Sequence, residues 1–190
     1  MKPKLWDVII VGAGPAGLSA ALILGRACRQ VLICDSGTPR SWASKRMHGF
    51  LTRDGISPES FRRAAHGELR ALSNVTFVAG EATRAVRRTD GGFACTIGRR
   101  QQVSGRKLLI ATGLLDHLPH IDGIEKFFGK TVFQCPYCDG WEFRNARVAV
   151  YGRGHRGFEM ARAMTAWSDD VLLCTDGYRR VPRAWRIGLD

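Results

Sequence analysis

Short apolar runs alternate with a helical pattern along the first 35 residues. Residues 5–11 form a β-branched apolar run, which is typical of a buried parallel strand, and a second run covers residues 31–34 and ends at Asp35. Between the two runs, residues 18–26 carry apolar side chains at helical spacing. Pro15 suits the first helical turn, because the backbone N–H that proline lacks would be unpaired there. The pattern predicts a βαβ unit.

The next segment changes from a loop to a helix and a strand. Residues 37–58 are rich in Gly, Ser, Arg and Pro, which indicates a loop. Ser57 and Pro58 are suitable as the cap and first turn of a helix, so we expect a helix from there to Leu72. A short strand at residues 75–78 follows.

An alternating pattern then covers residues 82–103, with a turn at residues 90–92. This combination predicts an antiparallel hairpin or meander. Residues 107–111 return to the pattern of a buried strand, which ends at Thr112.

The strand–glycine–helix–strand pattern occurs a second time, about 140 residues after the first. Residues 146–151 predict a buried strand, a glycine-rich turn and a helical stretch to Trp167 follow, and a last apolar run covers residues 171–174. Two such units in one chain predict an α/β protein.

Composition excludes several classes of protein. The 190 residues are 45% hydrophobic and 24% charged, unlike a disordered, collagen-like or disulfide-scaffold chain, and the length allows one domain or one and a fraction. The net charge of +12 comes mainly from arginines that stand in scattered pairs between acidic residues, without a long basic run. We therefore expect a solvated basic surface and no nucleic-acid partner.

Neither a membrane span nor a secreted disulfide framework is expected. The apolar stretch at residues 8–24 is interrupted by glycines and a proline and lacks the length of a span. Cys28, Cys34, Cys95 and Cys174 are isolated, and we expect them to pack as small hydrophobic side chains. The absence of a signal peptide and the cysteine usage predict a reducing, cytoplasmic location.

The first glycine turn has the spacing of a dinucleotide-binding turn. Gly12, Gly14 and Gly17 form G-x-G-x-x-G between the predicted strand and helix, and Asp35 lies 23 residues after Gly12. Glycines let the backbone approach a pyrophosphate, and the acid suits a ribose hydroxyl. A purely structural glycine turn is the alternative, and the complete context favours dinucleotide binding.

The second glycine turn leaves two interpretations open. Gly152, Gly154 and Gly157 have the same spacing, and Asp176 lies 24 residues after Gly152. The turn also contains three cationic side chains, which could favour a phosphate or could replace it: Arg153, His155 and Arg156. The turn is either a second nucleotide site or a fold element that binds nothing.

Cys135 and Cys138 are close enough in sequence to act together. A single C-x-x-C without a second pair or a downstream histidine pair does not complete a zinc site, so no metal ligand is expected. In a reducing compartment, this spacing favours thiol–disulfide exchange over metal binding or an accidental pair.

Taken together in their order, these motifs resemble the low-molecular-weight thioredoxin reductase family. The resemblance extends from Asp7 to Asp176 and rests on residues 12–17, 111–113, 135–140 and 152–154. It implies a Rossmann-like FAD-binding parallel sheet with an antiparallel meander, followed by an incomplete second Rossmann-like nucleotide-binding domain. We expect the FAD-binding domain at residues 1–116 and a partial NAD(P)-binding domain with the redox cysteines at residues 117–190.

The resemblance also implies roles for individual residues. Cys138 would face the flavin C4a atom, Cys135 would exchange with the substrate, and Asp139 would act as general acid and base. The second turn would hold NADPH or NADH. The residues expected to contact FAD are Gly12, Gly14, Pro15, Ala16, Gly17, Asp35, Ser36, His48, Ala82, Ala111, Thr112 and Gly113.

Two features concern the electron partner. Pro136-Tyr137 and the run at residues 48–55 are similar to a branch that includes enzymes which oxidise small-molecule dithiols with oxygen. NADPH-dependent members carry a His-Arg-Arg cluster after the strand that corresponds to residues 171–174, whereas this chain has Thr175 and Asp176. An acid there suits a ribose hydroxyl and would repel a 2′-phosphate.

The leading hypothesis is an FAD-linked thiol–disulfide oxidoreductase that acts on a thioredoxin-like protein or on a small-molecule disulfide or dithiol, with a homodimer as a further expectation. A dithiol oxidase and a non-catalytic flavoprotein fragment are the alternatives. The chain ends before the family's closing flavin-domain strand, so we expect weak FAD retention and negligible turnover from these 190 residues alone.

Overall fold

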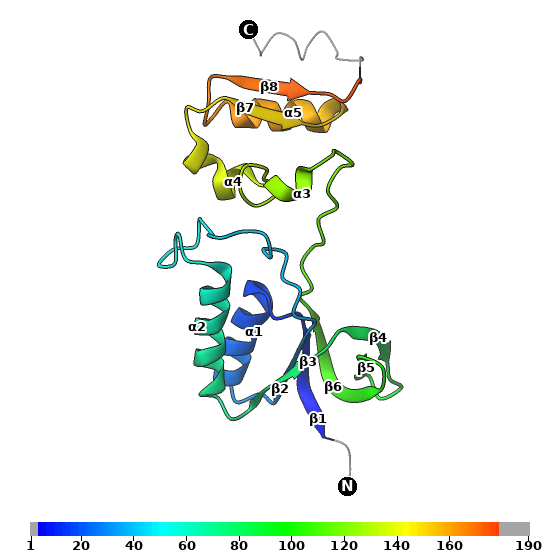
Figure 1. Ribbon diagram of the computed structural model, residues 1–190. Coiled ribbons are helices and arrows are strands. Elements are labelled where there is room, and N and C mark those ends of the chain that lie inside the picture. The colour runs from blue at the N-terminus through cyan, green and yellow to red at the C-terminus, as the bar shows by residue number, and fades with distance from the viewer. Residues whose placement is uncertain (1–3, 179–190) are drawn as a thin grey trace. The chain divides into compact units, whose positions relative to one another are not determined.

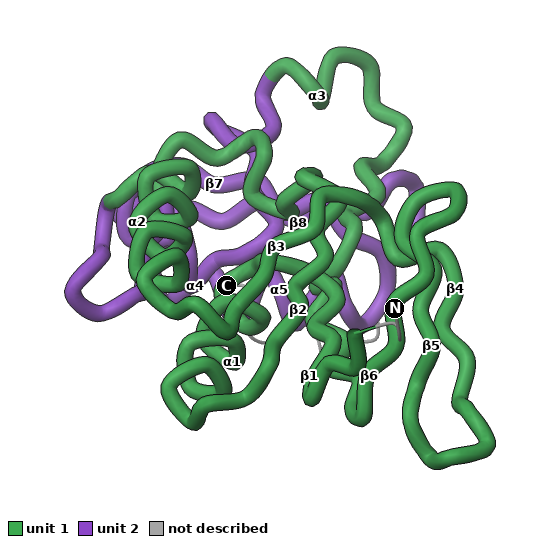
Figure 2. Tube along the Cα trace, turned by 90° about the horizontal axis from the view of Figure 1, so that it is seen from below, with its two compact units in different colours: residues 1–46, 56–126 green, residues 47–55, 127–190 purple. Residues whose placement is uncertain are grey.

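The chain forms two compact units in the computed structural model, which describes residues 4–178 (Figure 2). Unit 1 comprises residues 1–46 and 56–126, and unit 2 comprises residues 47–55 and 127–190. The sequence predicts a domain boundary after residue 116. The two compact units divide after residue 126, and the segment 47–55 groups with unit 2. That the two units are separate functional domains stays a prediction.

Unit 1 contains a six-stranded sheet in the order β3-β2-β1-β6-β5-β4. The strands β1, β2, β3 and β6 are parallel, and β4 and β5 continue the sheet in antiparallel pairing. This is the expected α/β sheet with an antiparallel meander. The strands are β1 (Leu5–Val11), β2 (Val31–Asp35), β3 (Val75–Ala79), β4 (Ala82–Arg87), β5 (Phe93–Ile97) and β6 (Gln101–Ile110).

The strand β6 differs from the sequence prediction. We expected the meander to end near residue 103 and a separate buried strand to begin at residue 107. One continuous strand serves both purposes, because residues 101–105 pair antiparallel with β5 and residues 104–110 pair parallel with β1. Gly105 is the reason that the strand can pass close to β1, since a Cβ atom there would lie 2.8 Å from the Ile9 side chain.

Two helices lie side by side on one face of the parallel strands (Figure 1). The helix α1 (Pro15–Arg26) begins at the expected proline, and α2 (Pro58–Arg70) begins after Ser57, whose hydroxyl accepts a hydrogen bond from the Ser60 N–H at 3.0 Å. This cap was predicted, but α2 ends two residues before Leu72. Leu18 of α1 and Leu69 of α2 are buried in a common core with the sheet.

The strand period of two divides neighbouring side chains between two cores. Ile10 and Ile33 are fully buried on the helical face, whereas Ile9, Leu32 and Cys34 belong to a second cluster on the opposite face with Cys95. Because both faces of β1 and β2 are covered, their sequences read as continuous apolar runs.

Unit 2 contains the expected second strand–helix–strand unit. The strands β7 (Val148–Tyr151) and β8 (Val171–Cys174) pair in parallel, and α5 (Gly154–Met164) connects them. Val150, Ala161 and Met164 form its buried core. Three short helical segments were not predicted from the sequence: α3 (Ile124–Phe127), α4 (Pro136–Asp139) and the 3-10 helix η1 (Gly140–Phe143).

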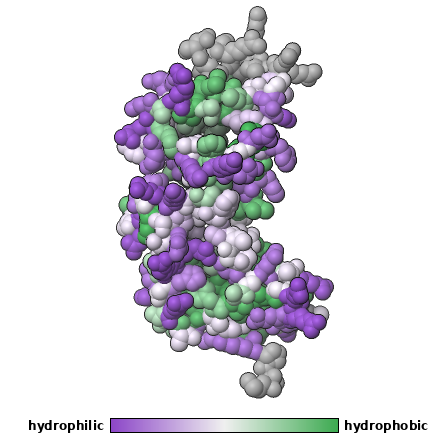
Figure 3. All heavy atoms as spheres, in the orientation of Figure 1, coloured by the Kyte–Doolittle hydropathy of each residue, from purple (hydrophilic) through white to green (hydrophobic). Residues whose placement is uncertain are grey.

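The visible face of the protein is consistent with the expected scattering of charged side chains over the surface (Figure 3). On the face drawn in Figure 3, hydrophilic residues are distributed over both units and interleaved with smaller apolar areas. Across residues 4–178, every helix is too short or too polar to traverse a lipid bilayer. The same part of the chain contains no cluster of three or more His, Cys, Asp or Glu side chains that could hold a metal ion.

The expectation that all four isolated cysteines are packed is wrong for Cys28. Cys34 and Cys95 are buried, Cys174 is partly buried, and Cys28 is exposed. Cys28 follows the end of α1 with φ +58°, and its N–H donates to the Gly25 carbonyl at 3.0 Å. A residue in the left-handed conformation at the end of a helix lies beyond the packed face of that helix. Cys28 is therefore exposed, although its neighbours in sequence include apolar residues.

Candidate functional site

The first glycine turn lies where the carboxyl ends of β1, β2 and β6 meet. The Gly12 N–H donates to the Cys34 carbonyl at 2.8 Å, and the Ala111 N–H donates to the Val11 carbonyl at 2.8 Å. Gly12 has φ +104°, and a Cβ atom there would overlap the Ala111 carbonyl oxygen. The first glycine is therefore required by the fold itself.

The second glycine of the turn has a different role. Gly14 caps α1 with φ −76°, which any residue can adopt, and a Cβ atom on Gly14 would meet no atom within 4 Å. Gly17, in contrast, lies against the Gly12 carbonyl, so a side chain there would break the turn. Since Gly12 and Gly17 are explained by packing and Gly14 is not, the space beside Gly14 is the part of the turn that is free to accept a ligand.

Asp35 is held in place by two groups of unit 1. Its Oδ1 accepts the Ala13 N–H at 3.1 Å, and its Oδ2 accepts from the Arg62 guanidinium at 3.1 Å. The carboxylate is thereby fixed at the end of β2, next to the glycine turn. Arg62 was not singled out in the sequence analysis, because its place in α2 is 27 residues from Asp35 and no local pattern connects them.

The remaining predicted FAD contacts of unit 1 border the same edge of the sheet. Ser36 follows Asp35, and its hydroxyl is 2.8 Å from that of Thr38. Thr112 and Gly113 follow β6 directly, and Gly113 has φ +67°. Ala82 opens β4 just after Gly80, whose N–H donates to the Asp35 carbonyl at 2.8 Å. The structure thus brings together all the predicted FAD contacts except His48, which belongs to unit 2.

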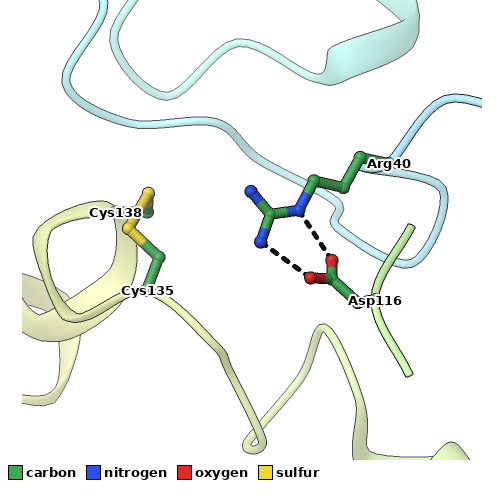
Figure 4. Close-up of a disulfide and its surroundings, with 4 residues drawn as sticks. All are labelled: Arg40, Asp116, Cys135 and Cys138. Atoms are coloured by element: carbon green, nitrogen blue, oxygen red, sulfur yellow. Dashed lines mark hydrogen bonds and ion pairs between the residues drawn. A yellow bond between two sulfur atoms is a disulfide. The ribbon is translucent and has the colours of Figure 1, made fainter. Parts of the chain in front are cut away.

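A cavity of about 700 Å³ lies elsewhere in unit 1, between the loop that follows β2 and the helix α2. Its walls include Trp42, Lys45, Arg62, His66 and Arg70, and none of the predicted dinucleotide contacts lines it. The loop is joined to the segment after β6 by a bidentate pair between Arg40 and Asp116, with both distances 2.7 Å (Figure 4). This hydrogen-bonded guanidinium lowers the pKa of Asp116.

In unit 2, Cys135 and Cys138 form a disulfide with their Cα atoms 5.3 Å apart (Figure 4). Cys135 is the residue that caps α4, and Pro136 begins the helix, so the four-residue motif closes one helical turn. The N–H groups of Cys138 and Asp139 both donate to the Cys135 carbonyl, at 3.2 and 3.3 Å. Cys138 is exposed and Cys135 is partly buried. The helical turn therefore places the two cysteines at a distance that a disulfide can span.

Trp167 anchors this turn to the core of unit 2. A Cβ atom on Gly140 would lie 3.1 Å from the Trp167 ring, so the glycine after Asp139 allows the ring to lie directly against the backbone. The Tyr137 ring meets the Trp167 ring edge-on, with centroids 5.3 Å apart. Tyr137 itself is 80% exposed. The backbone after the motif therefore packs against Trp167, whereas the aromatic side chain between the cysteines is exposed.

Asp139 lies in an acidic and partly buried environment. Burial raises the pKa of its carboxyl group, the His48 charge opposes this effect, and Glu142 adds to it. His48 Nδ1 is 3.4 Å from an Asp54 oxygen and 3.6 Å from a Glu142 oxygen. Asp54 and Glu142 were not predicted as site residues, although Glu142 follows Asp139 by three residues, which is the spacing of one helical turn.

The second glycine turn repeats one hydrogen bond of the first. The Gly152 N–H donates to the Cys174 carbonyl at 3.0 Å, as Gly12 does to Cys34 in unit 1. Gly152 and Gly157 also lie against each other, since a Cβ atom on Gly152 would be 2.7 Å from the Gly157 Cα atom. Both glycines are thus explained by helix packing.

The middle of the second turn differs from the first. Gly154 has φ +59°, and the Tyr178 ring lies 3.9 Å from the position that its Cβ atom would occupy. The Asp176 carboxylate is bound by the Arg153 guanidinium and accepts a hydrogen bond from the Tyr151 hydroxyl at 2.9 Å. These contacts lower the pKa of Asp176, with Arg153 the largest contributor. Groups of the chain itself already bind the acid that was predicted to bind ribose.

The order of these features along the chain agrees with a known family. Residues 6–183 match the family described as pyridine nucleotide-disulphide oxidoreductase. The chain belongs to this family. A curated relative, a probable thioredoxin reductase from Arthroderma benhamiae, is 30% identical over 177 residues, which are 90% of this chain and 44% of the relative.

Solved structures agree with the family and the fold. A putative thioredoxin reductase from Bacillus anthracis has a TM-score of 0.90 and 31% identity, covering 96% of this chain and 61% of that one. HlmI has a TM-score of 0.92 and 35% identity, covering 97% of this chain and 58% of its own. The resemblance to thioredoxin reductases is thus confirmed. The chain spans about half the length of the relatives it matches.

Pyridine nucleotide-disulphide oxidoreductases use FAD and NAD(P)H, and the residues of this chain agree unequally with the two cofactors. The first turn has open space beside Gly14, a helix start without a side-chain cap and a fixed Asp35, which together suit the pyrophosphate and ribose of a dinucleotide. The second turn has the same glycine spacing, but the Tyr178 ring lies 3.9 Å from the Cβ position of Gly154, and Asp176 is paired with Arg153.

Proposed function

We propose that this chain carries the flavin-binding turn and the redox disulfide of a thiol–disulfide oxidoreductase that resembles thioredoxin reductase. The observation that supports the proposal most directly is the Cys135–Cys138 disulfide on one helical turn, beside the partly buried Asp139. It occurs in the same chain as a dinucleotide turn that is open at Gly14.

The chain's own residues would act in the following way. Bound FAD supplies reversible two-electron transfer to and from the cysteine pair. Two electrons break the S–S bond and leave two thiolates, one of which takes a proton from Asp139. The Cys135 thiolate then attacks a substrate disulfide, which releases one substrate thiolate and forms a mixed disulfide. Cys138, after losing its proton, attacks the Cys135 sulfur, which releases the second substrate thiolate and re-forms the Cys135–Cys138 disulfide. The substrate gains the two electrons, and the pair returns to its oxidised form.

Two substrate classes agree with this chemistry, a thioredoxin-like protein and a small-molecule disulfide. The curated relative from Arthroderma benhamiae is named a probable thioredoxin reductase, which supports the first class. We further infer a reducing cytoplasmic location from the unpaired cysteines, and a homodimer from the family resemblance. Light scattering of the purified chain tests the dimer.

A second direction of electron flow is supported by the second glycine turn. Because the Tyr178 ring lies 3.9 Å from the Cβ position of Gly154, whereas the Cβ position of Gly14 has no atom within 4 Å, nicotinamide binding is less favoured than flavin binding. The same cysteine pair could then take two electrons from a small dithiol, which becomes a disulfide, and oxygen would accept them from the flavin. This is the dithiol-oxidase alternative.

One anaerobic experiment separates the two directions. The purified chain is loaded with FAD and titrated with NADH, NADPH or a small dithiol while flavin absorbance is followed. Bleaching by a nicotinamide supports the reductase. Bleaching by the dithiol alone, with reoxidation by oxygen, supports the oxidase. Bleaching by neither, in a chain that holds FAD, would contradict both and favour a non-catalytic flavoprotein. The double variant Cys135→Ser/Cys138→Ser is the control, because it keeps the first glycine turn and removes the disulfide.

A further inference from the structure

The segment Met47–Gly55 contributes a histidine to the surroundings of the redox pair. This segment belongs to unit 2, although it precedes the rest of that unit by more than 70 residues of chain. His48 is only 15% exposed in its side chain. Its Nδ1 atom lies 3.4 Å from an Asp54 oxygen and 3.6 Å from a Glu142 oxygen.

Two carboxylates, those of Asp54 and Glu142, lie near the Nδ1 atom of His48. Asp54 holds the start of its own segment, since its Oδ1 accepts the Gly49 N–H at 2.8 Å, and the Gly55 N–H donates to the Met47 carbonyl at 2.9 Å. Glu142 belongs to η1, which directly continues the helical turn of Cys138 and Asp139. The Nδ1 atom of His48 therefore lies near one carboxylate of its own loop and one carboxylate of the helical segment that continues the redox motif.

The charged groups that act on Asp139, among the described residues, are His48 from the segment Met47–Gly55 and Glu142 from η1. They oppose each other. A protonated His48 favours the Asp139 carboxylate, whereas Glu142 favours the neutral acid, as burial does. Asp54 lies near the same Nδ1 atom of His48 as Glu142 does.

We propose that His48 is a positioning residue for the redox pair: its Nδ1 atom lies near the carboxylates of Asp54 and Glu142, which favour the imidazolium form, and this positive charge stabilises the carboxylate that remains on Asp139 after Asp139 gives a proton to a cysteine thiolate. The acid–base group of this site is then a cluster of one histidine and three carboxylates rather than a single aspartate. The inference rests on the proposed function, because it assigns to Asp139 the proton that the thiolate takes up when the S–S bond is reduced.

The proton balance of the step is simple. Reduction of the disulfide by two electrons, which bound FAD would supply, leaves two thiolates, and Asp139 as the neutral acid would protonate one of them. Asp139 is then a carboxylate that the charge of His48 favours, and it regains a proton from solvent when the pair is oxidised again. Without the His48 charge, the carboxylate product would be less stable, and Asp139 would keep its proton to higher pH.

The test is a carboxyl-carbon NMR titration of the oxidised 190-residue chain, in which the Asp139 signal is assigned with Asp139→Asn. We expect His48→Asn to move the Asp139 titration midpoint upward by about 1 pH unit. Glu142→Gln should move it downward. His120→Asn, an exposed histidine of unit 1, should leave it unchanged. Backbone amide spectra confirm that each variant is folded.

The two opposite shifts distinguish an electrostatic role from a structural one, because a general loosening of unit 2 would move both variants in one direction. An unchanged midpoint in His48→Asn, or shifts of the same sign in both variants, would overturn the inference. If His48→Asn does not fold, the Glu142→Gln shift and a His48→Gln variant carry the test. Anaerobic reduction of the pair is measured separately. Opposite shifts in a chain whose pair is never reduced would refute the proposed function and leave the coupling of His48 to Asp139 established.

Discussion

The Arg153 guanidinium of the second glycine turn binds the Asp176 carboxylate, which lies after β8 at the position expected for a ribose-binding acid. A free acid there would repel a nucleotide 2′-phosphate, but a paired acid has its negative charge largely balanced. The pair therefore changes the expectation from the sequence, in which Asp176 alone would discriminate between the two nicotinamide cofactors.

This relationship predicts a change in nucleotide preference when Arg153 is removed. In Arg153→Gln, Asp176 is no longer paired, so 2′,5′-ADP should bind about three- to tenfold more weakly relative to 5′-AMP than it does to the parent chain. Isothermal titration of both nucleotides measures the ratio. Arg147→Gln is the matched control, because Arg147 pairs with Asp170 at 2.8 Å and lies outside the turn. An unchanged ratio would show that the Arg153–Asp176 pair has no part in nucleotide discrimination.

Gly14 offers a clean test of dinucleotide binding. A Cβ atom at this position would meet no atom within 4 Å, and the backbone conformation is an ordinary one, so Gly14→Val should have a melting temperature close to that of the parent. FAD affinity should fall by at least about tenfold, because the side chain occupies the space that a pyrophosphate needs. Fluorescence titration with FAD measures the affinity.

Two further glycine variants complete this experiment. Gly67→Val, in an open and exposed position of α2, controls for the substitution itself and should bind FAD as the parent does. Gly17→Val should unfold unit 1, since its side chain would collide with the Gly12 carbonyl. If Gly14→Val retained FAD as well as the parent, the turn would have only a structural role.

The cysteines should differ in reactivity according to burial. Cys28 is exposed and should react with iodoacetamide in the folded chain, as should the Cys135 and Cys138 thiols after mild reduction. Burial raises the pKa of the Cys34 and Cys95 thiols. Both should react at least about 10³-fold more slowly than Cys28, because the reagent reaches them only when the chain unfolds. Mass spectrometry of timed samples measures each site. Equal labelling of Cys28 and Cys34 would contradict the burial pattern.

The folded chain should lose stability as pH rises, because Asp139 must ionise in a partly buried position. Burial raises the pKa of this carboxyl above its value in the unfolded chain. The folded chain thus binds the proton more tightly, and stability is lost as pH rises from the unfolded pKa through the folded one. Asp139→Asn has no proton to lose, so its melting temperature should exceed that of the parent at pH 7 by more than at pH 4.

Thermal unfolding across this pH range tests the prediction, with Asp122→Asn, an exposed aspartate of unit 1, as the control. The difference between Asp122→Asn and the parent should not depend on pH in the same way. A constant difference for Asp139→Asn between pH 4 and pH 7 would mean that the carboxyl is not destabilised by burial.

The regular elements could be predicted from the sequence because their signals are local. The strands around Ile9 and Leu32 show continuous apolar runs, and Ser57 with Pro58 gives a standard helix start. The strand β6 was divided in the prediction, because its two halves have different partners and therefore different patterns of burial. The short helix α4 has too few residues to show a period.

The site was only partly predictable for the same reason. Glycine spacing and the C-x-x-C pair are local motifs, and the structure places them at the ends of strands and on one helical turn as the motifs require. The pairs Arg62–Asp35 and Arg153–Asp176 join residues 27 and 23 positions apart, and the partners carry no sequence mark that connects them. Charge pairing of this kind depends on the fold as a whole.

The assignment of the segment Met47–Gly55 to unit 2 has a consequence for any attempt to divide the protein. The chain passes from one unit to the other after residues 46, 55 and 126, so one protease cut after residue 126 leaves the His48 segment attached to unit 1 by both of its ends. A recombinant fragment that begins at residue 127 would contain the cysteine pair without the His48 imidazole that lies near Glu142. Separate expression of unit 2 therefore requires residues 47–55 to be supplied as well, as a fused or added peptide.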